Sequence, residues 1–365
     1  MKRVLLIATF VVALASPAAA QFGQKKSAFR FTGDGLMRYE WTQGIPTPGG
    51  DLVDENRYLL EARPRMEAVF GPVELGVGGL FNYSKYDNTE FDDGLPRPIV
   101  RDNYFSRDAR FDVYYAKVKA GPLRAEGGRM IMPMLLPEMI WDRDLRPRGG
   151  VVSLVFDQAG SESRFAVRGI YTKGSHWFED ESELLGGSAE LVIGGGQKSQ
   201  LSLAGSYLYF RDLDTVDMRI RRQNTLDQAG LYVFDYRVVD IHAGVVSGGQ
   251  MPFVLSFDYA WNTAVDENNK GLWLQVAMGQ LEISRAWLEY TYAKIDRDAT
   301  VAAFNADDFF WGTGYQAHRL DLGAATGRGT SIHGIASMQR LQDGDLQIES
   351  NDWVRRYRIE WRYSF

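Results

Sequence analysis

The sequence contains no cysteine among its 365 residues. Disulfide bonds, thiolate metal sites and a lipid-modified cysteine are therefore excluded. After residue 20 there is also no apolar run near the roughly 20 residues that a membrane-spanning helix requires, which excludes a helical membrane protein. The formal net charge is −6, and an acidic balance argues against nucleic acid as a partner.

The one apolar stretch of note stands at the start of the chain. Lys2 and Arg3 precede it, and the alanines at 18–20 follow it as the small residues of a cleavage site. This is the pattern of a secretory signal peptide. We expect residues 1–20 to be removed on export and residues 21–365 to form one domain, since no Pro- or Ser-rich linker or long charge block interrupts them.

Apolar and polar residues alternate in the rest of the chain. In the last ten residues Tyr357, Ile359, Trp361, Tyr363 and Phe365 share one face, and Arg356, Arg358, Glu360, Arg362 and Ser364 share the other. Residues 56–70, 253–262 and 271–279 follow the same rule. A period of two is that of a β-strand. No comparable stretch has helical periodicity, so we expect an all-β protein.

Two kinds of break separate these strands, and they take turns along the chain. Short Gly-containing breaks stand at 71–72, 121–122, 194–196, 279–280 and 327–329, and long polar ones at 87–103, 176–187 and 297–308. Outer-membrane barrels have short periplasmic turns and long extracellular loops. The pattern predicts a transmembrane antiparallel β-barrel of about 16 strands, with both termini on the periplasmic side.

A closed barrel explains why every strand can be charged on one face. In hydrocarbon all backbone polar groups must be paired, which a closed sheet achieves. The outward residues then meet outer-membrane lipid, and the inward residues meet water. We expect the last strand to close the barrel against the first. In outer-membrane proteins generally, a terminal strand ending in an aromatic residue such as Phe365 resembles the signal read by the barrel-assembly machinery.

Three stretches resemble a family of bacterial outer-membrane β-barrel porins: GGRMIMPMLLPEMIWDRDLRPRGG (127–150), GGQMPFVLSFDYAWNT (248–263) and the Tyr-rich segment 288–338. They cover roughly a quarter of the chain. At 133–137 the sequence PMLLP departs from the family's usual Asn-Pro-Phe type sequence. The resemblance implies a location in the outer membrane of a Gram-negative bacterium, passage of small hydrophilic solutes and a homotrimer.

A barrel of this size encloses an aqueous channel, so selectivity depends on what narrows it. The segment 133–150 is too apolar for a loop in free water, and folding it into the lumen would bury its apolar side chains. We expect it to form the pore constriction with Glu138, Asp142, Arg143, Asp144, Arg146 and Arg148. The alternative is a loop that packs on a neighbouring subunit or lies across the mouth.

The inward faces are rich in arginine. The pore-wall candidates are Arg57, Arg63, Arg65, Arg164, Arg168, Arg285, Arg356 and Arg358, and Arg319 and Arg362 share their phase. Charged walls around a narrow channel concentrate counter-ions. We therefore expect a weak anion preference. The alternative is that these charges pair across strands with inward carboxylates and cancel.

Other functions receive less support. The histidines, His176, His242, His318 and His333, have no nucleophile spacing beside them, so we expect no enzyme, no cofactor and no metal site. A closed or plugged barrel that binds a ligand or acts as a scaffold is the second hypothesis. Its binding loop would be 297–314, where Phe304, Phe309, Phe310 and Trp311 cluster. We favour the other explanation of this cluster, an aromatic girdle at the outer interface.

Overall fold

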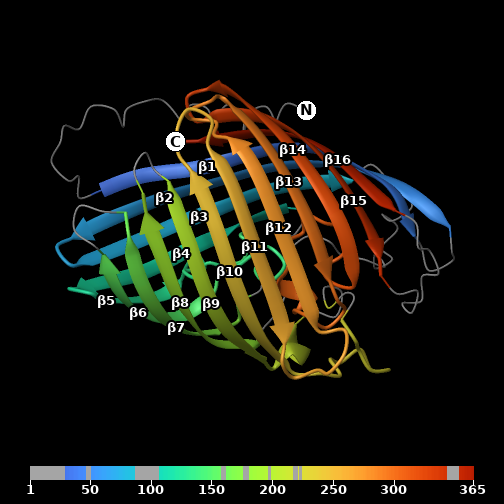
Figure 1. Cartoon of the computed structure of the whole chain (residues 1–365), viewed down its shortest axis with the longest axis horizontal. Helices are drawn as coiled ribbons and strands as arrows, with labels where there is room; N and C mark the ends of the chain where they lie inside the picture. Colours follow the sequence, from blue (N-terminus) through green and yellow to red (C-terminus); the bar gives the residue numbers. More distant parts are fainter. Residues whose placement is uncertain are drawn as a thin grey trace.

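The protein is a closed barrel of sixteen antiparallel strands in which each strand pairs with its neighbours in the sequence (Figure 1). The computed structural model describes residues 29–46, 51–86, 107–157, 162–175, 181–195, 199–216, 221, 224–342 and 353–365. The signal peptide expected at residues 1–20 lies outside the described residues. The expected all-β barrel and its number of strands are confirmed.

The strands differ in length around the barrel. In chain order they are β1 (Phe29–Pro46), β2 (Leu52–Phe70), β3 (Val73–Tyr86), β4 (Arg107–Ala120), β5 (Leu123–Arg129), β6 (Arg148–Asp157), β7 (Arg164–Lys173), β8 (Glu183–Gly194), β9 (Gln200–Arg211), β10 (Tyr236–Ser247), β11 (Phe253–Asn262), β12 (Lys270–Gly279), β13 (Ala286–Ile295), β14 (Tyr315–Gly327), β15 (Thr330–Leu341) and β16 (Val354–Ser364). Two short 3-10 turns, η4 (Leu213–Thr215) and η6 (Ala302–Phe304), lie in long connections. None of the helical segments in the described ranges is long and apolar enough to cross a membrane.

The barrel closes where its first and last strands meet. Met37 of β1 lies opposite Trp361 of β16 in an antiparallel register that runs from Asp34 to Gln43. At the chain end, the backbones of Gly33 and Phe365 exchange two hydrogen bonds of 3.0 Å. The expectation that the last strand closes against the first is confirmed.

The connections fall into two classes at opposite ends of the barrel. One end carries the short turns, such as 71–72, 121–122 and 328–329, together with the start of β1 and the end of β16. The other end carries the long connections, among them 130–147, 212–235 and 296–314. The long break expected at 176–187 ends earlier, because the residues from Glu183 onward already pair with β7 and β9.

Alternation decides which side chains face outward. On β16, the side chain of Ile359 is 63% exposed and that of Glu360 only 1%. β11 repeats the pattern, with Phe253 and Trp261 exposed and Asp258 buried. The outward surface of these strands is thus largely apolar, whereas charged side chains such as Asp258 and Glu360 point into the lumen, where partners and water can satisfy them.

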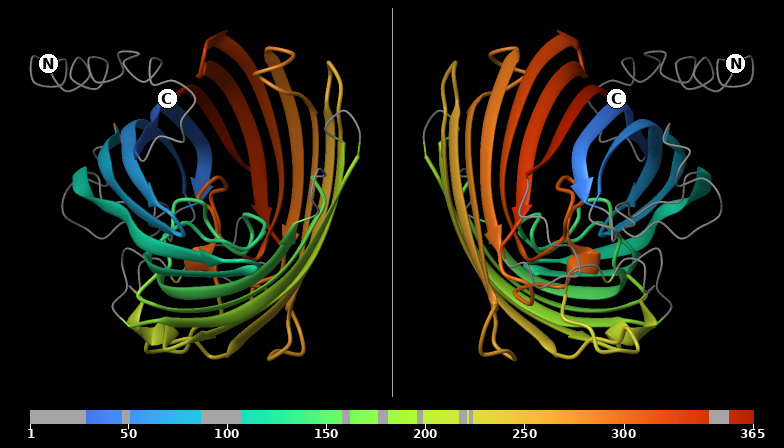
Figure 2. Two further views of the ribbon diagram at one scale, coloured as in Figure 1. Left: turned by 90° about the vertical axis from the view of Figure 1, so that its left-hand side faces the viewer. Right: turned by 90° about the vertical axis from the view of Figure 1, so that its right-hand side faces the viewer.

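Part of the lumen holds a packed apolar core. Figure 2 shows the 130–147 and 296–314 connections folded inside the ring of strands. They bury Met139, Ile140, Trp141, Phe304, Phe309, Phe310 and Trp311 in one cluster with wall residues such as Phe210 and Trp273. The aromatic residues of 297–314 are therefore neither an exposed binding loop nor a lipid-facing girdle. They are core, because the two inward loops cover each other's apolar side chains.

Candidate functional site

Two loops build the candidate constriction by packing on each other. The Trp141 ring lies 5.4 Å from that of Phe304, between ring centroids. The backbone N–H of Asp142 donates to the carbonyl of Phe304 at 2.7 Å, and that of Ala306 donates to the carbonyl of Glu138 at 2.9 Å. The 130–147 and 296–314 connections therefore behave as one unit inside the barrel.

Ion pairs attach this unit to several strands of the wall. Arg319 of β14 contacts Glu138 at 2.9 Å, and Arg63 of β2 contacts Asp144 at 2.5 Å. Arg146 of the loop contacts Asp112 of β4 at 3.1 Å, with both groups buried. These contacts come from β14, β2 and β4, so the 130–147 loop lies inside the lumen and is not draped over its mouth.

Asp308 on the second loop joins two wall arginines. Its carboxylate lies 3.0 Å from Arg319 and 2.5 Å from Arg358 of β16. Burial disfavours the charged carboxylate, but the guanidiniums of Arg319, Arg358 and Arg38 outweigh that effect and hold the pKa of Asp308 well below its usual range. Asp308 is therefore a fixed negative charge in the lumen.

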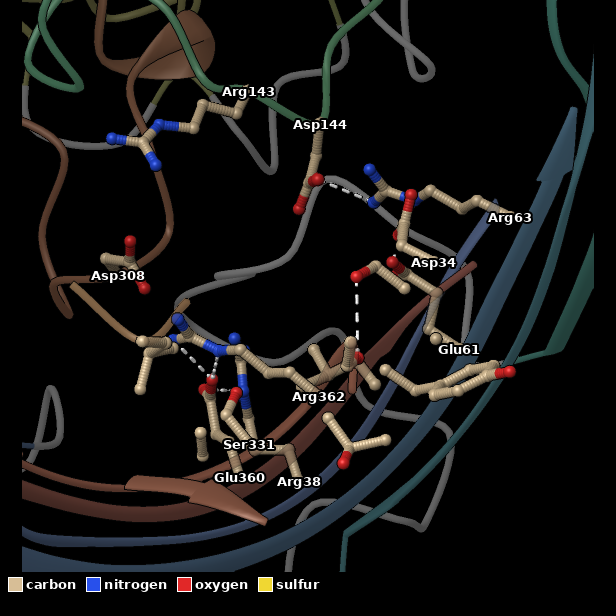
Figure 3. A pocket seen from close by; sticks show the side chains of 18 of the residues that line it. Asp34, Arg38, Glu61, Arg63, Arg143, Asp144, Asp308, Ser331, Glu360 and Arg362 are labelled. Atoms are coloured by element: carbon tan, nitrogen blue, oxygen red, sulfur yellow. Dashed lines mark hydrogen bonds and ion pairs between the residues drawn. The ribbon is translucent and has the colours of Figure 1, made fainter. Parts of the chain in front are cut away.

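Beside these loops lies a cavity of about 890 Å³ that extends to the short-turn end (Figure 3). Nine carboxylate residues line it: Asp34, Glu61, Glu138, Asp142, Asp144, Glu282, Asp307, Asp308 and Glu360. Six arginines line it as well: Arg38, Arg63, Arg143, Arg285, Arg328 and Arg362. A small hydrophilic solute fits this volume, and every side of it offers charged hydrogen-bonding groups.

Three aspartates of the two loops stand close together. Carboxylate oxygens of Asp142, Asp144 and Asp307 lie within 4.8 Å of one another. Burial, reinforced by the charges of Asp144 and Asp307, raises the pKa of Asp142 well above its usual value. Asp142 also accepts the backbone N–H of Asp144 at 2.7 Å. A cluster whose central acid favours its proton is no basis for assigning a metal site.

The predicted constriction residues separate into three groups. Glu138, Asp142, Arg143 and Asp144 line the cavity, and the Arg143 side chain is 77% exposed within it. Arg146 is buried behind them against β4. Arg148 does not belong to the constriction: it pairs in register with Arg129, whose neighbour Tyr114 faces outward, and it donates to the carbonyl of Lys173 at 3.1 Å.

Most of the predicted wall arginines lie on the inward face of their strands. Arg57, Arg63, Arg356 and Arg358 are buried, and Arg65 is half-buried on the same face. Arg164 and Arg168 both contact the Glu190 carboxylate of the neighbouring β8, at 2.5 and 2.7 Å. Arg285 is the exception. It is an exposed residue of the 280–285 turn with φ of 59°, so it lines the cavity from its short-turn mouth and is not part of a strand.

Several lining residues escaped the sequence reasoning, among them Asp34, Arg38, Asp307 and Asp308. Arg38 contacts Glu360 across the barrel seam at 2.6 Å. The alternation LMRYEWT of the first strand contained the signal for Arg38. No sequence signal placed Asp307 and Asp308 in the lumen, because loops have no periodicity from which to read a face.

Two histidines lie in hydrogen-bonded chains that the sequence did not reveal. His242 lies 3.0 Å from the Ser202 hydroxyl and 2.7 Å from Asp258. His333 lies 3.0 Å from Ser331 and 2.8 Å from Asp321. The serines sit in strands whose backbone N–H groups serve the sheet on both sides, so those groups are not free to stabilise an oxyanion. The chains brace neighbouring strands.

Comparison with known proteins identifies the fold. No family model matches the chain, and no curated protein matches it. The structure of Pseudomonas putida OprB at high pH superposes with a TM-score of 0.59 at 9% identity, covering 93% of this chain and 94% of that one. Salmonella typhi OmpF in complex with daunomycin gives a TM-score of 0.53 at 12% identity, covering 92% and 97%.

An anion-selective porin from Comamonas acidovorans also gives a TM-score of 0.53 at 12% identity, covering 92% of this chain and 99% of that one. At such identities the likeness establishes the architecture. The chain has the fold of the bacterial porins, and the resemblance seen in the sequence is confirmed at that level.

Proposed function

We propose that the protein is an outer-membrane porin, a passive diffusion channel for small hydrophilic solutes or ions. The observation that carries this proposal is the charged cavity of about 890 Å³ inside a closed sixteen-stranded barrel. A lumen lined by ionisable groups suits water and hydrated solutes, whereas the apolar outer surface suits lipid. The porin fold of its structural relatives supports the same function.

The proposed location is the outer membrane of a Gram-negative bacterium, after removal of residues 1–20. The short turns at the end where β1 starts and β16 ends support an orientation with that end in the periplasm. Phe365 would present the terminal strand to the barrel-assembly machinery. A homotrimer is proposed from the porin fold alone.

We propose that the paired loops set the pore's narrowest point. Arg143 and Asp144 project from the 130–147 loop into the cavity, and Asp308 projects from the second loop (Figure 3). Glu138 of the first loop lines the same cavity. Because ion pairs hold both loops to the wall, the constriction is rigid and fixes the positions of these charges. Solutes would be sorted by size and by hydrogen bonding at this level.

The selectivity depends on how far the lumen charges cancel. From the wall arginines we propose a weak preference for anions. One structural relative, from Comamonas acidovorans, is described as anion-selective. However, the wall arginines Arg168 and Arg358 each contact a carboxylate of the neighbouring strand, which supports the alternative that the lumen charges pair across strands and cancel. The cavity itself has more carboxylates than arginines in its lining. The preference should therefore be small.

A plugged barrel that binds a ligand or acts as a scaffold is the second candidate. The apolar cluster of Trp141, Phe304 and Trp311 inside the lumen favours it, because this core fills space that a wide channel would leave open.

Single-channel conductance of the purified barrel in a planar bilayer distinguishes the two. Stable conductance steps support a porin, and their occurrence in threes supports a trimer. A folded barrel that conducts nothing would overturn the porin proposal in favour of the plugged barrel. A reversal potential in a salt gradient reports the selectivity, and clear cation selectivity would overturn the anion preference.

A further inference from the structure

Charge on the outward face of the strands is confined to one end of the barrel. In the described strands, the outward-facing basic residues all stand at the end that carries the long connections. We call this set the basic belt: Lys85, Arg129, Arg148, Lys173, Arg211, Arg237, Lys270, Lys294, Arg340 and Arg355. The outward acidic residues at this end of the described strands are Asp54 on β2 and Glu183 on β8.

The register shows that these side chains face outward. Lys85 lies opposite Tyr58, Lys294 opposite Leu272, and Arg355 opposite Met338. Residues opposite each other in a sheet project from the same face, and these partners belong to the apolar outer surface. The belt thus borders the lipid-facing band and does not line the lumen.

The opposite end of the barrel has no such charges. Its outward residues in the described strands carry no charge, and they include the exposed Phe29, Phe70, Phe156, Phe165 and Phe253. Aromatic side chains suit the interface of a lipid bilayer. Both ends border the same apolar band, but one is basic on its outward face and the other is aromatic. This difference indicates that the two ends meet different lipid leaflets, and that the leaflet beside the long connections is negatively charged.

Four belt residues on β12, β13, β15 and β16 make the strongest part of the belt. Lys270, Lys294, Arg340 and Arg355 form no ion pair with a carboxylate among the residues that the structure describes. Elsewhere in the belt Arg211 contacts Glu183 at 3.4 Å, and Arg237 contacts Asp235 at 3.1 Å. We call the four residues the open patch.

Contacts with neighbouring side chains hold part of the open patch in place. Lys294, Gln316 and Arg340 face the same way in one cross-strand row. The Arg340 guanidinium lies over the Trp353 ring, 5.0 Å from its centroid, and donates to Gln316 at 3.3 Å. Figure 1 shows β12 to β16 side by side, so these cations form one surface.

We propose that the open patch binds the phosphate groups of anionic lipid headgroups in the leaflet on the long-connection side. Guanidinium and ammonium groups are the side chains that recognise phosphate, and each one near an anionic membrane surface strengthens attachment. The inference rests on the proposed membrane location but does not require that the barrel conduct.

The test uses the folded full-length barrel in neutral detergent micelles, titrated with fluorescent phosphatidylglycerol or with phosphatidylcholine. The variant K270Q/K294Q/R355Q removes three cations of the open patch and leaves Arg340 in its contacts. The matched control, R30Q/K119Q/R124Q, removes three cations at the opposite end of the barrel, away from the cavity lining. Heat-dependent electrophoretic mobility verifies that each variant is folded, and planar-bilayer conductance is recorded separately.

The wild-type and control barrels should bind phosphatidylglycerol in preference to phosphatidylcholine, and this preference should weaken with added salt. The patch variant should lose about 100-fold in affinity for phosphatidylglycerol. Equal loss in the control variant, or an unchanged affinity in the patch variant, would overturn the proposal. Intact lipid preference in a barrel without conductance would reject the porin function and leave the lipid site standing.

Discussion

The guanidinium of Arg319 on β14 donates to the carboxylate of Glu138 at 2.9 Å, although the two residues lie 181 positions apart. The same guanidinium contacts Glu289 on β13 and Asp308 on the second loop, each at 3.0 Å. One wall arginine thus ties both lumen loops to the same part of the sheet. The position of the constriction depends on this side chain as much as on the loops themselves.

Replacing Arg319 with glutamine should loosen both loops. The change leaves Glu138, Glu289 and Asp308 without their shared cation, and breaking a buried ion pair costs about 3–5 kcal/mol. We expect noisier single-channel currents with larger open steps. Arg168→Gln, which affects only a wall pair with Glu190, is the control. Currents as quiet as those of the wild type would contradict the tethering role.

Phe304→Ala tests whether the aromatic residues are a lumen core. The Phe304 ring is buried between Trp141 and Phe210, with centroid distances of 5.4 and 5.3 Å. Truncating a buried phenylalanine costs about 3–5 kcal/mol. Limited proteolysis should therefore cut the 296–314 connection faster. Phe257→Ala, on the exposed outer face of β11, should leave the cleavage rate unchanged, and equal rates in both variants would exclude the core role.

Asp142 should make loop packing sensitive to pH. Its pKa is raised in the folded protein, so the native state binds more protons than the unfolded chain. Its contribution is complete below the unfolded pKa of about 3.9 and declines as pH rises through the folded value. Asp142→Asn keeps a neutral side chain, so loop proteolysis should change less between pH 5 and 8. A variant with the wild-type pH slope would assign the dependence to another group.

Gly33→Val should weaken the seam of the barrel. A Cβ at Gly33 would lie 2.5 Å from the Phe365 ring and 2.9 Å from the carbonyl oxygen of Arg63. Crowding of this kind costs about 1–3 kcal/mol, so the unfolding midpoint in urea should fall. Gly334→Val is the matched control, since nothing lies within 4 Å of its Cβ position. The seam argument fails if both variants unfold at the same urea concentration.

The alternation of apolar and polar residues along a strand decides whether the sequence can predict that a residue faces the lumen or the lipid. Arg358 and Glu360 were placed inward because five apolar residues alternate with them on the last strand, and both are buried. The segment 133–150 reads as one continuous loop, which predicts Arg148 to be a loop residue. It is in fact the first residue of β6, and the alternation of that strand turns it outward. An error of one residue in the strand register therefore places a side chain on the lipid-facing side instead of the lumen side.

Loops show the limit of the same reasoning. The aromatic content of 297–314 fits an outer girdle as well as a core. The two are distinguished by contacts inside the lumen, such as that of Phe304 with Trp141 on the other loop. Likewise, the basic belt consists of single residues at strand ends, each unremarkable in its own segment. The belt is recognisable only once the strands from β3 to β16 are placed in their order around the barrel.

The sequence by itself determined the all-β barrel, the approximate number of its strands, the inward and outward faces of the clearly alternating strands such as β16, and the two classes of connection. These follow from local alternation and turn residues, which need no knowledge of distant contacts. The tertiary structure alone decided where the two inward loops meet, which arginines are paired, and which cations remain open to lipid. Those outcomes depend on pairs such as Arg319 and Glu138, whose positions in the chain contain no signal of their proximity.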